Sequence, residues 1–178
     1  MKKFVLSLLA VAGLGFGCAA RQAQDKVLVA YVSMTGTTQH AAQILAKVSG
    51  GELYEIAPEV RYSAADLDWR DKESRCFVEM HNLKFRPAMV AAGLDIDKYD
   101  VIYLGYPIWW NMAPTLVNTF IEAHKLEGKI VIPFATSGGD GIENSVKVLK
   151  KTYPEIDWQG GKLLNGADEQ SVKAWLNR

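Results

Sequence analysis

A hydroxyl-rich turn near the start of the chain has the composition of an anion-binding site. It lies between an apolar run, residues 26–32, and a helical pattern that begins near Thr38. A helix start leaves backbone N–H groups unpaired and carries the positive end of the helix dipole, so it attracts an anion. A glycine lets the backbone approach a ligand closely, and hydroxyl groups supply further donors to phosphate oxygens. The residues of this turn are Ser33, Met34, Thr35, Gly36, Thr37 and Thr38.

The turn lacks the residues that define two common nucleotide loops. A Walker loop needs Gly-Lys-Ser/Thr, and the turn has no lysine. The dinucleotide fingerprint needs G-x-G-x-x-G, and the turn has a single glycine. We therefore predict a neutral cradle for one terminal phosphate. The alternative is that a threonine only caps the helix, with no ligand bound.

A second loop is rich in aromatic residues and lies between two prolines. It contains Tyr106, Pro107, Ile108, Trp109 and Trp110, and ends at Pro114. Two adjacent tryptophans must point in different directions. We predict that one indole packs inward and the other forms a wall for a flat aromatic ligand, a pairing worth about 0.5–1.5 kcal/mol beyond burial. The alternative is that both indoles are packing residues.

A third loop, residues 136–141, combines glycines with small polar side chains. Its first residues are Thr136, Ser137, Gly138, Gly139 and Asp140. Closely spaced backbone donors with little side-chain bulk can lie against the edge of a planar ring, although the same composition is common in flexible turns. We expect Asp140 to be exposed in the turn; the alternative is that it touches the edge of the ring. A phosphate cradle, an aromatic wall and a polar edge together predict a flat heterocycle on a phosphorylated tail, which is FMN.

The elements that position these loops alternate along the chain. Runs rich in Val, Ile and Leu predict strands over residues 26–32, 100–105 and 129–135, with weaker strands over 52–57 and 162–164. Amphipathic helices are predicted over residues 38–48, 115–124, 142–151 and 167–176. Strict alternation predicts a parallel sheet with helices on both faces. Every strand-to-helix loop of such a sheet falls at one edge, so the three loops are expected to converge on one pocket.

Residues 58–93 are too long for a simple connection between elements. They include Tyr62, Trp69 and a dense charge cluster at residues 70–75. One interpretation is a single helix from Ala64 to about Asn82 with an irregular exit. The other is a flap that borders a site. Periodicity does not decide between them.

The first twenty residues predict an export signal. A basic start, an apolar core over residues 4–12 and a small-residue stretch over residues 13–20 follow one another. The apolar run falls short of the ~18 or more residues usual for a membrane span. Lipidation at Cys18 is slightly favoured over cleavage after Ala20. We therefore expect one domain, residues 21–178, exported to the periplasm or cell envelope, with a lipid on Cys18 as its membrane contact.

The charge balance argues against a nucleic-acid-binding protein, and the cysteine content excludes an intramolecular disulfide. Loss of Lys2 and Lys3 with the leader leaves 18 basic and 20 acidic residues, a net charge of about −2. Nothing in that balance provides a nucleic-acid surface. Cys76 is the only cysteine after Cys18, so no intramolecular disulfide can form. We expect Cys76 to be a small core residue with no further role.

The three loops together resemble those of the flavodoxin family. Residues 33–38 are similar to the family's Thr/Ser-x-Thr-Gly-x-Thr phosphate loop, with Thr37 where asparagine is common. Residues 105–110, Gly-Tyr-Pro-Ile-Trp-Trp, and 134–139, Phe-Ala-Thr-Ser-Gly-Gly, resemble a largely bacterial branch of the family. The similarity extends from about Lys26 to Leu164.

The resemblance implies a three-layer α/β sandwich with a five-stranded parallel sheet in the order 2-1-3-4-5 and a non-covalently bound FMN. It implies that the phosphate is held by Ser33, Thr35, Gly36, Thr37 and Thr38. It implies that the isoalloxazine ring is flanked by Pro107, Trp109 and Trp110, and we favour Trp109 as the stacking residue. The polar edge of the ring would meet Thr136, Ser137, Gly138 and Gly139.

The expected function is electron transfer through FMN, with no side chain acting as acid or base. The protein would be a shuttle for a redox partner protein, or a small reductase of a quinone or similar acceptor. Electron-carrier flavodoxins are usually strongly acidic, and the near-zero charge here would weaken electrostatic steering toward a partner. The alternative is a non-enzymatic cell-envelope binding module that keeps the same fold.

Overall fold

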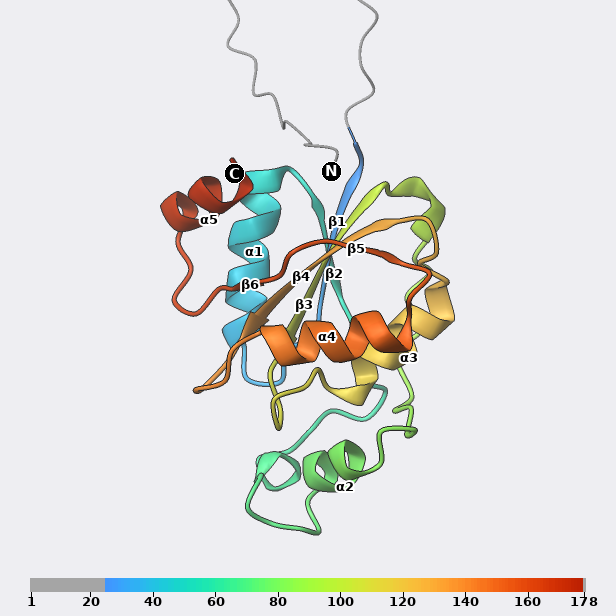
Figure 1. The fold of residues 1–178 in the computed structure, drawn as a ribbon. Helices are drawn as coiled ribbons and strands as arrows, with labels where there is room; N and C mark the ends of the chain where they lie inside the picture. Colours follow the sequence, from blue (N-terminus) through green and yellow to red (C-terminus); the bar gives the residue numbers. More distant parts are fainter. Residues whose placement is uncertain (1–24, 178) are drawn as a thin grey trace, which may run out of the picture.

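The computed structural model describes residues 25–177, which form a parallel sheet with helices on both faces (Figure 1). The strands are β1 (Val27–Tyr31), β2 (Glu52–Glu55), β3 (Val101–Pro107), β4 (Ile130–Thr136), β5 (Asp157–Trp158) and β6 (Lys162–Leu163). The helices are α1 (Thr37–Ser49), α2 (Arg75–His81), α3 (Thr115–His124), α4 (Glu143–Thr152) and α5 (Glu169–Leu176). The export signal predicted over residues 1–20, with Cys18, lies outside the described residues. Within those residues, no helix is long and apolar enough to span a bilayer.

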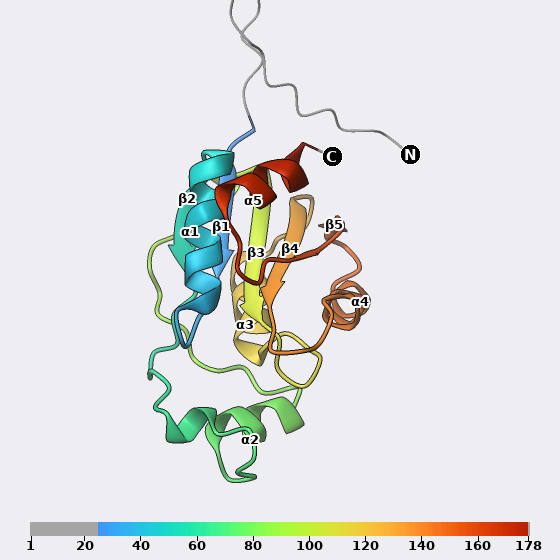
Figure 2. The same ribbon diagram turned by 90° about the vertical axis from the view of Figure 1, so that its left-hand side faces the viewer.

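The sheet has the predicted order β2-β1-β3-β4-β5, with every pair parallel. Successive side chains of a strand point to opposite faces of the sheet. The central strands are buried on both faces, because a layer of helices covers each face. On β3, Tyr103 faces the layer of α1 and α5, whereas Ile102 and Leu104 face the layer of α3 and α4. The two helical layers are seen on either side of the sheet in Figure 2. This confirms the three-layer α/β architecture.

The strand predicted over residues 162–164 corresponds to β6, which together with β5 forms one interrupted edge strand of the sheet. β5 and β6 both pair with β4, but three steps on β4, Val131 to Phe134, are matched by four steps, Trp158 to Lys162. The extra residue is a bulge in the edge strand. Val131 and Ala135 accept hydrogen bonds from this edge, from Gln159 (2.9 Å) and Leu164 (2.8 Å).

Pro133 accounts for the position of this break. Alternate residues of a strand bond toward the same neighbour, so Pro133 faces the edge as Val131 and Ala135 do. Proline has no N–H group to donate to a ladder. The regular pairing therefore stops opposite Pro133, and the chain crosses that point through Gly160 and Gly161.

The single helix considered for residues 64–82 is wrong. The structure has a short 3-10 helix, Ala65–Leu67, and then α2, which begins at Arg75. Side chains capture local backbone groups between the two: Asp68 accepts from the Arg70 N–H (3.1 Å), and Ser74 caps α2 by accepting from the Phe77 N–H (3.3 Å). Such local bonds compete with a continuous helix. The segment lies beyond the carboxyl edge of the sheet, beside the loops that leave β1 and β3 (Figures 1 and 2).

Gly105 on β3 provides a test of the packing between the central strands. A Cβ atom at this position would lie 2.2 Å from the ring of Phe134, which is fully buried on β4. We expect Gly105→Ala to lower the free energy of unfolding by about 1–3 kcal/mol, as overpacking of a core does. Urea denaturation measures the change. Gly160→Ala is the matched control, because a Cβ there meets no atom within 4 Å; equal losses in the two variants would contradict this account.

Candidate functional site

A pocket of about 770 Å³ lies at the carboxyl edge of the sheet, where the loops after β1, β3 and β4 meet. The predicted residues that line it are Met34, Thr35, Thr37, Thr38, Pro107, Ile108, Trp109, Trp110, Thr136, Ser137, Gly138 and Gly139. Thus the three loops that sequence reasoning singled out do surround one hollow.

Ser33, Gly36 and Tyr106 were also predicted for the site, but they are not among the residues that line the pocket. Ser33 accepts a hydrogen bond from the Gly36 N–H (3.2 Å), so its hydroxyl shapes the first loop from within. Tyr106 is fully buried, and its hydroxyl lies 3.1 Å from that of Ser145 on α4. The pleat of β3 explains this placement, because Tyr106 and Pro107 point to opposite faces.

The first loop leaves several backbone donors free of the helix that follows. Gly36 has a φ of 89°, a left-handed conformation that glycine adopts without strain. The first bond of the α1 turn runs from the His40 N–H to the Gly36 carbonyl (2.9 Å). The N–H groups of Thr37, Thr38 and Gln39 therefore precede the first intrahelical bond. Together with the exposed hydroxyls of Thr35 and Thr37, which lie 3.4 Å apart, they form an uncharged anion cradle.

The first and third loops are joined by a buried hydrogen bond. The hydroxyls of Thr38 and Thr136 lie 2.8 Å apart, 98 positions apart in sequence, and both residues are almost fully buried. This bond fixes the start of α1 against the end of β4. It therefore sets the distance between the anion cradle of the first loop and the glycine-rich third loop.

The third loop uses some of its own donors internally, which the sequence did not indicate. The Ser137 N–H donates to Asn165 (2.9 Å), whose amide donates back to the Ser137 carbonyl (2.9 Å). The Gly139 and Asp140 N–H groups donate to the Ser137 hydroxyl at 3.2 and 2.9 Å. The loop is therefore a structured turn. Asp140 is exposed, as expected, and also lines the pocket.

Trp109 and Trp110 lie on a tight hairpin. The N–H groups of Trp109 and Met112 each donate to the other residue's carbonyl at 2.9 Å. The two residues between have positive φ, 45° at Trp110 and 61° at Asn111, as a type I′ turn requires. A left-handed tryptophan costs about 1–3 kcal/mol, and such strain is concentrated at functional sites.

The prediction that one indole packs inward is wrong, because both are half-buried and both line the pocket. Each packs edge-on against the segment of residues 58–93. Trp109 meets the ring of Tyr62 at a centroid distance of 5.8 Å, and Trp110 meets those of Phe77 and His81, each at 5.7 Å. The hairpin turns both side chains away from the sheet, so the segment beyond the sheet becomes their packing partner.

Residues 58–93 border the site, which is the second of the two interpretations of this segment. Leu67, Trp69 and Cys76 line the pocket and were missed by sequence reasoning, as was Asn165. Trp69 is 67% exposed, and its position directly before a charge cluster was the one signal available in the sequence. Cys76 is buried, as expected, and it also forms part of the pocket lining. Asn165 carried no signal, because its role depends on the position of Ser137.

The lining of the pocket is nearly free of charge. Among the described residues that line it, Asp140 is the one acidic residue, and none is a lysine, arginine or histidine. An anion bound there would be stabilised by hydroxyls, backbone N–H groups and the dipole of α1. Among the described residues, no three His, Cys, Asp or Glu side chains group in a way that could hold a metal ion.

The chain matches a family of known proteins. A family model described as flavodoxin matches residues 26–178, nearly the whole described chain. The chain belongs to the flavodoxin family. No curated protein matches it significantly.

Solved structures of flavodoxin-like proteins have the same fold. A protein of Bacteroides eggerthii described as a flavoprotein is 55% identical, with a TM-score of 0.84 over 86% of this chain and 97% of its own. A similar protein of Bacteroides uniformis is 52% identical, with a TM-score of 0.85 over 86% and 99%. A flavoprotein of Lactobacillus acidophilus, solved in complex with FMN, is 23% identical, with a TM-score of 0.68 over 86% and 99%. The similarity to the Lactobacillus acidophilus protein is one of fold.

A double-mutant cycle tests the bond between Thr38 and Thr136. Thr38→Val or Thr136→Val alone leaves a buried hydroxyl without its partner, so we expect each to lower the free energy of unfolding by about 1–3 kcal/mol. The double variant removes both hydroxyls, and its loss should fall short of the sum by about 1 kcal/mol. Urea denaturation of the four proteins measures this coupling. Strict additivity would show that the two hydroxyls do not stabilise each other.

Proposed function

We propose that this flavodoxin-family protein binds FMN in the pocket and uses it to transfer electrons. The observation that carries the proposal is the combination, around one hollow, of an uncharged anion cradle, two indoles and a polar glycine-rich turn. Membership of the flavodoxin family indicates FMN as the cofactor. The FMN complex of the Lactobacillus acidophilus flavoprotein, which has the same fold, supports this assignment.

The donors of the first loop suit the phosphate of FMN. The hydroxyls of Thr35 and Thr37 are exposed, and the start of α1 adds N–H groups and the positive end of its dipole. The hydroxyl of Thr38 is already paired with Thr136, so its backbone is the part available to a ligand. Neutral donors of this kind bind a phosphate without a lysine or arginine.

The remaining walls suit the isoalloxazine ring. Trp109 and Trp110 offer flat apolar surfaces, and Ser137 and Gly138 lie on the polar side of the hollow. FMN supplies the one- or two-electron chemistry when it is bound, and the protein tunes it through stacking, hydrogen bonds and exclusion of water. No residue of the pocket is needed as an acid or a base.

The character of the pocket rim favours a small reductase over a shuttle. Leu67, Trp69 and Cys76 give the rim an apolar, uncharged wall. A planar, uncharged acceptor such as a quinone suits this wall, whereas a charged protein partner would find little steering from a chain of near-zero net charge. We propose a quinone-like small molecule as the electron acceptor.

Export to the cell envelope is part of the same proposal. Because all strands are parallel, β1 starts at the edge of the sheet opposite the loops that follow β1, β3 and β4 (Figure 1), and these loops line the pocket. A lipid on Cys18 would therefore attach the chain at the end away from the site. The pocket would remain open to a soluble acceptor or reductant.

The phosphate cradle is tested by comparing two flavins. We expect Thr35→Ala combined with Thr37→Ala to weaken FMN binding at least tenfold, because a hydrogen bond to a charged group is worth about 1.5–3 kcal/mol. Riboflavin binding should change little, since riboflavin lacks the phosphate. Titration of the apoprotein by flavin fluorescence gives both dissociation constants. Thr152→Ala, on the outer side of α4, is the control. Equal losses of affinity for FMN and riboflavin would show that this loop does not bind the phosphate.

The type of electron transfer is tested by the two one-electron potentials of the bound flavin. We expect close values, as two-electron reduction of a quinone requires, and reduction of one equivalent of a water-soluble quinone by the pre-reduced protein in a single turnover. Potentiometric titration followed by absorbance measures both potentials. Widely separated values would indicate a shuttle. A protein that shows no flavin absorbance after incubation with FMN would be a binding module of another kind.

A further inference from the structure

Residues 58–93 are held together by polar contacts, with little apolar core of their own. Of the large hydrophobic side chains that are exposed in the described chain, most belong to this segment: Val60, Trp69, Val78, Leu83, Phe85 and Val90. A segment that buries so little apolar surface gains little from the hydrophobic effect. Its order must come from elsewhere.

A buried carboxylate at the centre of the segment provides that order. Glu79 on α2 is 4% exposed and accepts hydrogen bonds from the Tyr62 hydroxyl and from Arg75 Nε (2.6 Å). Arg75 also donates to the Val60 carbonyl (2.6 Å), and its guanidinium carbon lies 3.9 Å from the centre of the Tyr62 ring. Tyr62 is thus fixed at its hydroxyl by Glu79 and on one ring face by Arg75.

Burial and the adjacent Glu79 carboxylate raise the pKa of Tyr62 far above its usual value. The phenol therefore stays protonated and donates to Glu79 at any physiological pH. Burying a carboxylate is costly unless it is paired and hydrogen-bonded. Replacing such a group by apolar residues is often neutral or stabilising, so general stability does not explain this cluster.

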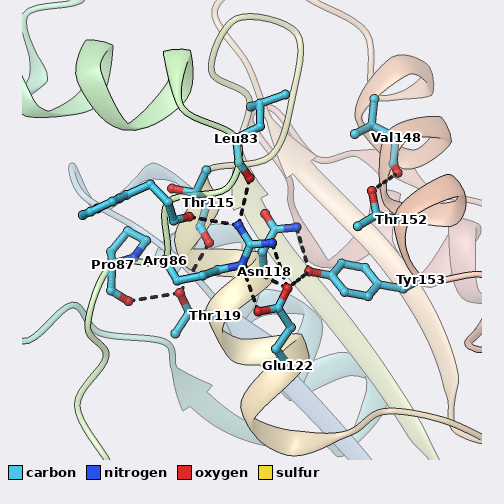
Figure 3. A network of polar contacts seen from close by, with 11 residues as sticks. Leu83, Arg86, Pro87, Thr115, Asn118, Thr119, Glu122, Val148, Thr152 and Tyr153 are labelled. Carbon is cyan, nitrogen blue, oxygen red and sulfur yellow. Dashed lines mark hydrogen bonds and ion pairs between the residues drawn. The ribbon is translucent and has the colours of Figure 1, made fainter.

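A second cluster ties the end of the segment to the body of the protein. Arg86 donates to both carboxylate oxygens of Glu122 on α3 at 2.8–3.0 Å, and the Tyr153 hydroxyl donates to the same carboxylate (2.6 Å) (Figure 3). The Thr119 hydroxyl donates to the Pro87 carbonyl (3.0 Å). Backbone bonds close the base of the segment, from Glu59 to Ala88 (3.0 Å) and from Val90 to Ala57 (2.9 Å). The segment is therefore a fixed support.

What this support holds is Trp109. The Tyr62 ring has Arg75 over one face and packs edge-to-face with the Trp109 indole, with 5.8 Å between the ring centroids and an interplanar angle of 71°. Edge-to-face pairs of this kind contribute about 0.5–1.5 kcal/mol beyond burial. Trp109 sits on a hairpin of only two turn residues and lines the pocket, so its indole depends on outside contacts for its orientation.

We propose that Tyr62 is a positioning residue: held by Glu79 and Arg75, it sets the orientation of the Trp109 indole in the pocket. The consequence for the cofactor rests on the proposed function, since the indole orientation then fixes the affinity and the potential of the bound flavin. Glu79 acts one step further away, through Tyr62.

The test compares two tyrosines with the same chemistry. Tyr62→Phe removes the hydroxyl that Glu79 accepts and keeps the ring. Tyr99→Phe is the matched control, because its hydroxyl donates to the Glu52 carboxylate (2.6 Å) beside β2, away from the pocket lining. Glu79→Gln, which keeps an acceptor but removes the charge, is the second variant.

The first readout needs no flavin. Near-ultraviolet circular dichroism of the apoprotein reports the asymmetry around tryptophans. We expect Tyr62→Phe to change the indole bands and Tyr99→Phe to leave them unchanged. In a Trp109→Phe background the effect of Tyr62→Phe on the indole bands should disappear, which assigns it to Trp109.

The second readout uses the FMN-loaded protein. We expect Tyr62→Phe to weaken FMN binding about tenfold and Glu79→Gln to weaken it less, in line with coupling between contacting residues. The midpoint potential and the fluorescence of the bound flavin should shift in both variants and stay unchanged in the Tyr99→Phe control. These quantities would not move if Tyr62 only stabilised the segment.

The outcomes separate this inference from the proposed function. If Tyr62→Phe and Tyr99→Phe alter the indole bands, FMN affinity and potential alike, Tyr62 does not position Trp109 and the inference is overturned. If the wild-type protein binds no FMN, the proposed function fails, and the indole bands of the apoprotein still decide whether Tyr62 orients Trp109.

Discussion

The parallel pairing of β3 with β1 on one side and β4 on the other is the constraint on which the site depends. It places the ends of three strands, separated by about a hundred residues of chain, at one edge of the sheet. Gly105 allows this packing, since the Phe134 ring occupies the space where a side chain on β3 would lie. A change that separated β3 from β4 would therefore pull apart the aromatic hairpin and the glycine-rich turn.

The loops at this edge are rigid because they bond to one another. Thr38 and Thr136 join the phosphate cradle to the end of β4, and Asn165 holds the turn at Ser137 from both sides. The left-handed backbone at Trp110 adds strain at the same edge, which the surrounding contacts must offset. A pocket built in this way is largely formed before a ligand arrives, and preformed sites lose less free energy on binding.

The segment of residues 58–93 completes the site and shares little of the core, against which its Met89 packs. It gives the pocket an apolar rim through Leu67, Trp69 and Cys76, while ionic contacts at the buried Glu79 and the exposed Glu122 hold it in place. The molecule thus combines a hydrophobic sheet that fixes the loops with a polar support that fixes the aromatic wall. The first determines where a flavin would lie, and the second how its surroundings are oriented.

The sequence by itself determined the alternation of strands and helices, the family, the sheet order that family implies and the three loops at one edge, because apolar periodicity and glycine-rich turns are local signals. It did not show the break at Pro133, the outward placement of both indoles, or the roles of Tyr62, Glu79 and Asn165. Those features depend on pairs of groups far apart along the chain, and only the tertiary structure brings them within bonding distance.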